Sequence, residues 1–230
     1  MSGEHEETTQ ITTIMPDRSV QLLSSGSQFR NQVIGTITLT ALLVAIFQAE
    51  VLVATALNYS SSQALFASFP IEVQMLITAT IGPFIHQGPR HLTDNLGVLI
   101  VAGAYLEYQY DRGLLYIFYP AVGYLAAWAP LAMSFVGSVG ASGVTFGLTT
   151  WLLVHSISRV LEMGYDGVLD LRILHFAAII FGLVKAQKAV AILAMKDGAD
   201  DVTHIVGAFL GLALGIKFVL DYHEIQILDL

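Results

Sequence analysis

The sequence predicts an all-α, polytopic membrane protein whose spanning helices form one bundle. Hydrophobic residues make up 55% of the 230 residues, before the 20 glycines are counted. Charged residues make up 12%, about half the share of a typical soluble domain, and the mean hydropathy is +0.68. A soluble globule of this size could not cover its core with so few charges. The composition therefore excludes a soluble enzyme and a disordered chain.

Charge and cysteine content exclude further classes. The formal net charge is −8, whereas a nucleic-acid binder needs a basic surface. The chain has no cysteine, which removes disulfides, thiolate metal sites and a cysteine nucleophile. A zinc protease would need a His-Glu-x-x-His run, and none is present. We expect no metal, no cofactor and no nucleic-acid partner.

Residues 1–30 are polar and rich in serine and threonine. A signal peptide would start with a positive segment followed by an apolar core, and this stretch has neither. We expect a flexible tail in the aqueous phase, followed by a membrane core over residues 31–222 and a short C-terminal tail over 223–230.

Six stretches approach the length of about 20 mostly apolar residues that a bilayer crossing needs. Between them lie polar or glycine-containing breaks at 110–113, 137–140, 162–167 and 196–201, which predict turns and loops. The predicted spans cover about 33–55, 91–110, 114–134, 142–160, 172–194 and 202–220.

The segment 56–90 is harder to assign. Its apolar stretch 75–85 is short, and Gly82 and Pro83 interrupt it. Apolar runs of this length are more often re-entrant or interfacial than spanning. We expect a long first loop that lies partly in the membrane surface, and a seventh span is the alternative.

Orientation follows from the distribution of lysine and arginine. With six spans and the N-terminal tail inside, the inner segments hold Arg18, Arg30, Arg112, Arg159, Arg172 and Lys217. The outer loops hold Arg90 and Lys196, and the stems of Lys185 and Lys188 in the fifth span can reach outward. The bias predicts that both termini are cytoplasmic.

Polar groups gather at the start of the even-numbered spans. Spans two, four and six all run from outside to inside, so their first turns lie at one depth near the outer face. Polar groups inside spans are costly and are functional candidates. These starts carry His91, Asp94, Asn95, Ser142, Thr203 and His204.

The spacing of these residues favours a shared site. His91 and Asn95 are four residues apart and share one helical face. Gly207 and Gly211 follow His204 on one face and would let another helix approach closely. Gly140, Ala141 and Gly143 surround Ser142 with small residues.

This set of side chains suits acyl transfer. A serine hydroxyl is a weak nucleophile and needs a base, which His204 can supply to Ser142. The oxyanion of the transition state needs donors, and His91, Asn95 and the backbone N–H of Ser142 could provide them. No carboxylate is placed to orient His204, so we expect a Ser–His dyad.

Each feature also has an ordinary structural interpretation. Gly207 and Gly211 occur widely as packing residues in membrane helices. A membrane serine usually bonds to its own helix backbone, and a histidine near the end of a span is usually interfacial. The coincidence of all these residues at one depth favours the catalytic interpretation.

The three motifs resemble those of the rhomboid intramembrane serine proteases. That family carries a Gly-x-Ser-Gly motif, a His-x-x-x-Asn pair and a His-x-x-Gly-x-x-x-Gly run. Along this chain the motifs occur in the order that the family shows, with the His-x-x-x-Asn pair first, and the resemblance covers about residues 31–220. The matching residues are Gly140, Ser142 and Gly143, then His91 and Asn95, then His204, Gly207 and Gly211.

The resemblance implies a six-helix rhomboid-like bundle that cuts transmembrane segments of other proteins near the outer face, after a small residue. It places the protein in the lipid bilayer, expected to be a prokaryotic cell membrane. It also extends to His86 and to a Gly-x-x-x-Glu pattern ending at Glu107, for which pairing with Arg112 is the alternative.

Three features depart from the family pattern. Phe146 stands where many members carry tyrosine, and it could pack against the ring of His204. The first loop lacks the Trp-Arg pair common in bacterial members, and Lys185 and Lys188 are unusual in the fifth helix.

Two other functions stay open at this point. A non-catalytic rhomboid-like protein would bind and escort membrane proteins, although such relatives usually lack the serine or the histidine. A small transporter or channel would use the polar layer for permeation, although the polar groups lie near one face and no inverted repeat is apparent.

Overall fold

The computed structural model describes residues 32–133, 135, 139–169 and 198–228. Within these ranges the chain is helical and forms no strand. The tail 1–30, the predicted span 172–194 and the residues Lys185 and Lys188 lie outside the described residues.

The helices follow the chain in a simple order. The first is α2 (Ile34–Ala56), and the next span-length unit consists of α5 (Pro89–Val98), the π-helical segment η3 (Leu99–Gly103) and α6 (Ala104–Gln109). Two short helices, α3 (Ser62–Ser68) and α4 (Ile71–Ile81), and the 3-10 turn η2 (Gly82–Phe84) lie between them. The remaining helices are α7 (Leu114–Ala132), α8 (Ser142–Leu169) and α10 (Ala199–Leu228).

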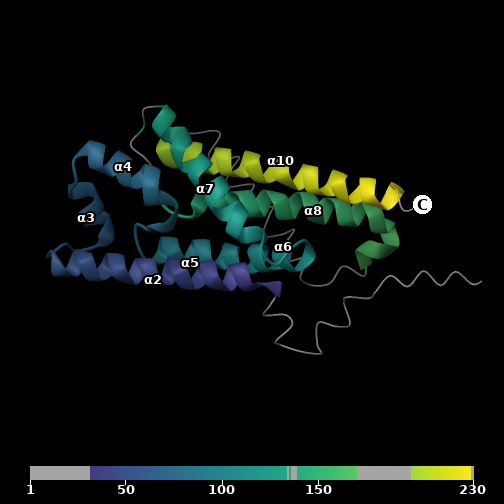
Figure 1. Ribbon diagram of the computed structural model, residues 1–230, viewed down its shortest axis with the longest axis horizontal. Coiled ribbons are helices and arrows are strands. Elements are labelled where there is room, and N and C mark those ends of the chain that lie inside the picture. Colours follow the sequence, from purple (N-terminus) through teal and green to yellow (C-terminus); the bar gives the residue numbers. More distant parts are fainter. Residues whose placement is uncertain (1–31, 134, 136–138, 170–197, 229–230) are drawn as a thin grey trace, which may run out of the picture.

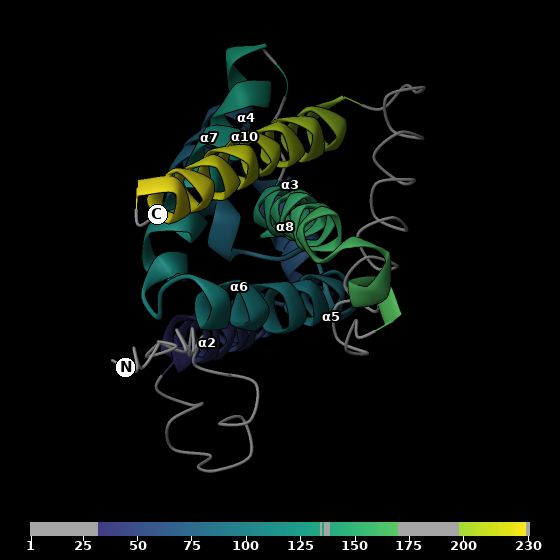
Figure 2. The same ribbon diagram turned by 90° about the vertical axis from the view of Figure 1, so that its right-hand side faces the viewer.

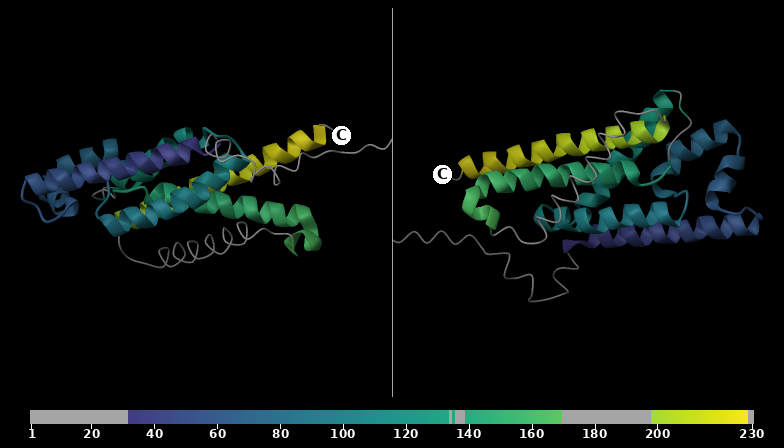
Figure 3. Two further views of the ribbon diagram at one scale, coloured as in Figure 1. Left: turned by 90° about the horizontal axis from the view of Figure 1, so that it is seen from below. Right: turned by 180° about the vertical axis from the view of Figure 1, so that it is seen from behind.

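The helices form two pairs, α2 with α5 and α6, and α8 with α10, and α7 contacts both pairs. In Figure 1, α2 lies beneath α5, and α8 and α10 run side by side above them. Figure 2 shows the bundle end-on, with α10 over α8 and α6 over α2, and Figure 3 shows the same layers from below and from behind. α7 contacts α10, α8, α4 and α2. The helices α5, α8 and α10 all begin at the same end of the bundle (Figure 1). The prediction that the polar residues at the starts of these helices lie at one depth requires this arrangement.

The helices match the predicted spans in the first half of the chain. Helical structure covers 34–56, 89–109 and 114–132, close to the predicted 33–55, 91–110 and 114–134. Among the described residues, three helices are long and apolar enough to cross a bilayer: Ile34–Ala56, Leu114–Ala132 and Asp200–Asp221. The crossings themselves remain predictions.

Two helices run on past the predicted ends of their spans. A loop was expected at 162–167, but α8 continues to Leu169, and α10 begins at Ala199 and continues to Leu228 through most of the expected C-terminal tail. Polar residues end a membrane span, yet a helix can run on into water. In α10, the first turn carries Asp200 and Asp201, whose charges favour a helix N-terminus.

The first loop contains α3 and α4. Helix α4 has 11 residues and is therefore about 16 Å long, about half of a bilayer core of about 30 Å. Its exposed Ile71 and Leu76 give it an apolar surface. This length speaks against a seventh span.

Aromatic side chains of α7 hold this loop. The Tyr124 hydroxyl donates to the Thr80 carbonyl at 2.8 Å, and the Trp128 indole N–H donates to the Ala79 carbonyl at 2.9 Å. These carbonyls belong to the last turn of α4, where the helix itself supplies no partner. The Tyr119 hydroxyl donates to the Pro83 carbonyl at 2.7 Å. Side chains of α7 thus satisfy backbone carbonyls of the first loop and hold the loop against α7.

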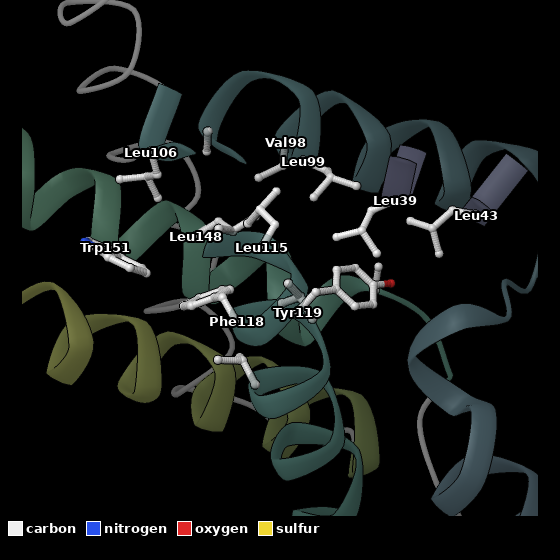
Figure 4. Packing of buried hydrophobic residues seen from close by; sticks show 14 of the residues in the cluster. Leu39, Leu43, Val98, Leu99, Leu106, Leu115, Phe118, Tyr119, Leu148 and Trp151 are labelled. Atoms are coloured by element: carbon white, nitrogen blue, oxygen red, sulfur yellow. The ribbon is translucent and has the colours of Figure 1, made fainter. Parts of the chain in front are cut away.

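The core lies where α2, α5, η3, α7 and α8 meet. Figure 4 shows these side chains converging, with Trp151 of α8 against Phe118 of α7. The ring centroids of Trp151 and Phe118 are 5.2 Å apart. The same cluster contains the buried side chains of Leu39, Leu43, Val98, Leu99, Leu106, Leu115, Tyr119 and Leu148.

A buried carboxylate joins α6 to α2. Glu107 is 2% exposed and accepts hydrogen bonds from the backbone N–H of Thr36 at 2.8 Å and from its hydroxyl at 3.0 Å. A methyl group added at Gly35 would overlap this carboxylate. Glu107 is therefore a partner of α2 rather than of Arg112.

Glycines bring α8 and α10 into backbone contact. A methyl group added at Gly207 would overlap the Gly143 carbonyl oxygen and lie 2.7 Å from its carbon, and one added at Gly211 would overlap the Gly147 carbonyl. The pairs advance in step, so the two helices run parallel. The Thr150 hydroxyl adds a bond across the contact, to the Ala208 carbonyl at 2.8 Å.

This contact yields a stability prediction. We expect Gly207→Ala to destabilise the protein by about 1–3 kcal/mol, because the methyl group forces the helices apart. Gly97→Ala is the matched control: nothing lies within 4 Å of a methyl group there, and alanine favours a helix. Thermal unfolding in detergent measures both. An unchanged midpoint for Gly207→Ala would contradict the close contact.

Candidate active site

Ser142 is the first residue of α8 and is 5% exposed. The chain reaches it through Gly140, whose φ of +128° is a backbone conformation that favours glycine. The Gly140 N–H donates to the Gly82 carbonyl of the first loop at 2.8 Å. Ser142 thus follows two residues, Gly140 and Ala141, of which the first is hydrogen-bonded to the first loop. We call these two residues the serine connection.

Helix α5 contributes His91 and Asn95 on the other side of this connection. A methyl group added at Gly140 would lie 2.6 Å from Cε1 of His91, so glycine is needed here for space as well as conformation. One turn further along, Asn95 is 4% exposed. Its Oδ1 accepts from the Thr145 hydroxyl over a long 3.4 Å.

The side-chain amide of Asn95 has a donor group that makes no hydrogen bond within the described residues. Its Nδ2 is buried and has no hydrogen-bond partner among the described residues. A buried donor without a partner is costly. The structure thus leaves one buried N–H donor group on the face of α5 that also contacts Thr145 of α8.

Helix α10 contributes His204. Its ring stacks on Phe146, with centroids 4.4 Å apart and planes inclined by 21°. Phe146 lies four residues after Ser142, one turn along α8. A methyl group added at Gly143 would lie 3.1 Å from Cγ2 of Thr203. The structure therefore brings the first turns of α8 and α10 together, and the packing expected between Phe146 and His204 is present.

His86, in the loop between η2 and α5, contacts the serine connection at Ala141. It is 2% exposed, and its ring meets that of His91 edge-on at 5.5 Å. Burial, with a smaller contribution from His91, lowers the pKa of His86 to about 4, and the Phe84 backbone partly opposes the shift. The imidazole is neutral at pH 7, and its Nε2 accepts from the Ala141 N–H over a long 3.5 Å.

Sequence reasoning did not single out three residues at this site. Thr145 bonds Asn95, Gly82 bonds Gly140, and Glu50 of α2 accepts from the His86 backbone N–H. Glu50 could have been found, because a carboxylate inside an apolar span is a signal in its own right. Asp94, by contrast, is exposed.

Comparison with known families decides the class of this bundle. The Rhomboid domain family model matches residues 70–220, which include every residue of the site apart from Glu50. The chain belongs to the rhomboid family. It is also 23% identical over 216 residues to the Rhomboid protease AarA of Providencia stuartii, covering 85% of this chain and 76% of that protein. The apolar helices and the rhomboid domain mark an integral membrane protein.

Proposed function

We propose that this rhomboid protein is an intramembrane serine endopeptidase that hydrolyses a peptide bond in or near the transmembrane segment of other membrane proteins. The observation that carries the proposal is the meeting of α8 and α10, which puts the turn bearing His204 beside the turn that begins with Ser142. The Rhomboid domain match and a relative named as a protease support it.

The reaction needs a Ser142–His204 dyad. The Ser142 hydroxyl oxygen attacks the scissile carbonyl carbon while the His204 imidazole takes its proton. When the C–N bond breaks, the imidazolium gives that proton to the leaving amine, which leaves an acyl-enzyme. Water then attacks the ester, with His204 as base again, and releases the carboxylate product and the free serine.

The developing oxyanion needs preorganised donors. The unpaired Nδ2 of Asn95, the His91 ring beside Gly140 and the backbone N–H of Ser142 at the start of α8 are the proposed set. The Thr145 hydroxyl donates to the Ser142 carbonyl at 2.9 Å and lies 3.4 Å from Oδ1 of Asn95, so it links the Asn95 amide to the first turn of α8.

The orientation of the site follows from the lysine and arginine bias. With both termini in the cytoplasm, the first turns of α5, α8 and α10 lie near the outer face. Hydrolysis requires water and an extended backbone, so the substrate helix must unwind there. Segments weakened by glycine or proline are the expected substrates.

Cleavage of a model transmembrane substrate tests the proposal. We expect the purified protein in liposomes to cut a substrate that contains glycine near its outer end, and Ser142→Ala to abolish cutting while thermal unfolding stays unchanged. Ser156→Ala on the same helix is the control, because Ser156 lies 14 residues further along. Intact substrates with the native protein, across several sequences and lipids, would favour the escort function.

The oxyanion role of Asn95 has its own test. We expect Asn95→Ala to lower turnover by roughly ten- to a thousandfold without unfolding the protein, because a donor that acts in the transition state is lost. Asp94→Ala is the matched control on α5, since Asp94 is exposed. Equal turnover of the Asn95 variant and native protein would remove Asn95 from the oxyanion site.

A further inference from the structure

Glu50 is a carboxylic acid within the apolar helix α2. The residues that follow it, Val51, Leu52 and Val53, are exposed by 38%, 69% and 50% on the apolar surface of the bundle. An ionisable side chain in such a span is costly and needs a compensating role. Glu50 lies outside the range that the family model matches.

The carboxylate bonds to the first loop. Its two oxygens each lie 3.2 Å from the backbone N–H of His86, which donates to both. His86 lies between η2 and α5, where no helix supplies a partner for this N–H. A charged or strongly polar acceptor makes such a bond stronger than a neutral one.

A second side chain fixes the other half of the same residue. The Ser62 hydroxyl of α3 donates to the His86 carbonyl at 3.1 Å. Both backbone groups of His86 are thus held by side chains, one from α2 and one from α3. The position of His86 is set from outside its own segment.

The imidazole of His86 contacts the serine connection directly, so the position of the His86 backbone affects that connection. It is 2% exposed, accepts from the Ala141 N–H and packs edge-on against His91. His91 in turn fills the space beside Gly140. A shift of the His86 backbone therefore moves the contacts of Gly140 and Ala141, the two residues that lead directly into Ser142.

We propose that Glu50 is a positioning residue for the Ser142 site, acting through His86. By accepting from the His86 backbone, it fixes the imidazole that supports Ala141 and His91. This inference rests on the proposed peptidase function. The rival is a purely structural role, in which Glu50 stabilises the first loop and has no influence on turnover by folded protein.

The two roles are separated by kinetics in liposomes with the full chain. We expect Glu50→Leu to lower kcat about 10- to 100-fold with KM within twofold of native, because small misplacements of reacting groups are costly. Glu50→Gln keeps an acceptor oxygen and should stay within about threefold of native kcat. Gln48→Leu is the matched control, an exposed polar residue on the same helix, and should leave both constants unchanged.

A second variant removes the hydrogen bond from Ser62 to the His86 carbonyl. We expect Ser62→Ala to lower kcat by about three- to tenfold, and the double variant Glu50→Leu/Ser62→Ala to fall little below Glu50→Leu. Such non-additivity is the mark of two residues that act through one group. Should Glu50→Leu not fold, the Ser62→Ala kinetics decide: a lower kcat at unchanged KM supports the inference, and a native kcat overturns it.

Three other results overturn the inference: native kcat for folded Glu50→Leu, an equal loss for Glu50→Gln and Glu50→Leu, or full multiplication of the two single losses in the double variant. Failure of the peptidase function is distinct, because then the native protein itself leaves every substrate intact.

Discussion

Helices in a bilayer gain little by burying apolar side chains against each other, because lipid tails are as apolar as leucine. What joins α8 to α10 is backbone contact, made possible by Gly143 and Gly147 on one helix and Gly207 and Gly211 on the other. This contact fixes the register of the two helices. It thereby brings the turn of His204 to the turn of Ser142, and the rest of the site is arranged around it.

The other parts of the site are held by polar bonds between distant segments. The Gly140 N–H reaches the first loop, and aromatic donors of α7 reach the end of α4. Each such bond supplies a partner that the local helix does not provide. The first loop can therefore act as a rigid support for the serine connection, with Glu50 and His86 as the link to α2.

The fold and the site were predictable to different extents. Hydropathy located the helices at 34–56, 89–109 and 114–132, because a bilayer imposes length and composition on whatever crosses it. It failed at 162–167, where α8 continues, because polarity limits the span and not the helix. Motif spacing led to Ser142, His204, His91 and Asn95 as the proposed site residues. It did not lead to Glu50 or to the partner of Glu107, because each bonds to a backbone group far away in the sequence, and no local pattern records such a pairing.

The most direct measurement of the central claim is labelling of the protein by a serine-directed fluorophosphonate, with the modified residue identified by mass spectrometry. The account predicts that Ser142 is labelled in native protein and that His204→Ala, although folded, is labelled far more slowly. Equal labelling of both proteins, or labelling at another serine, would contradict a reactive Ser142–His204 pair.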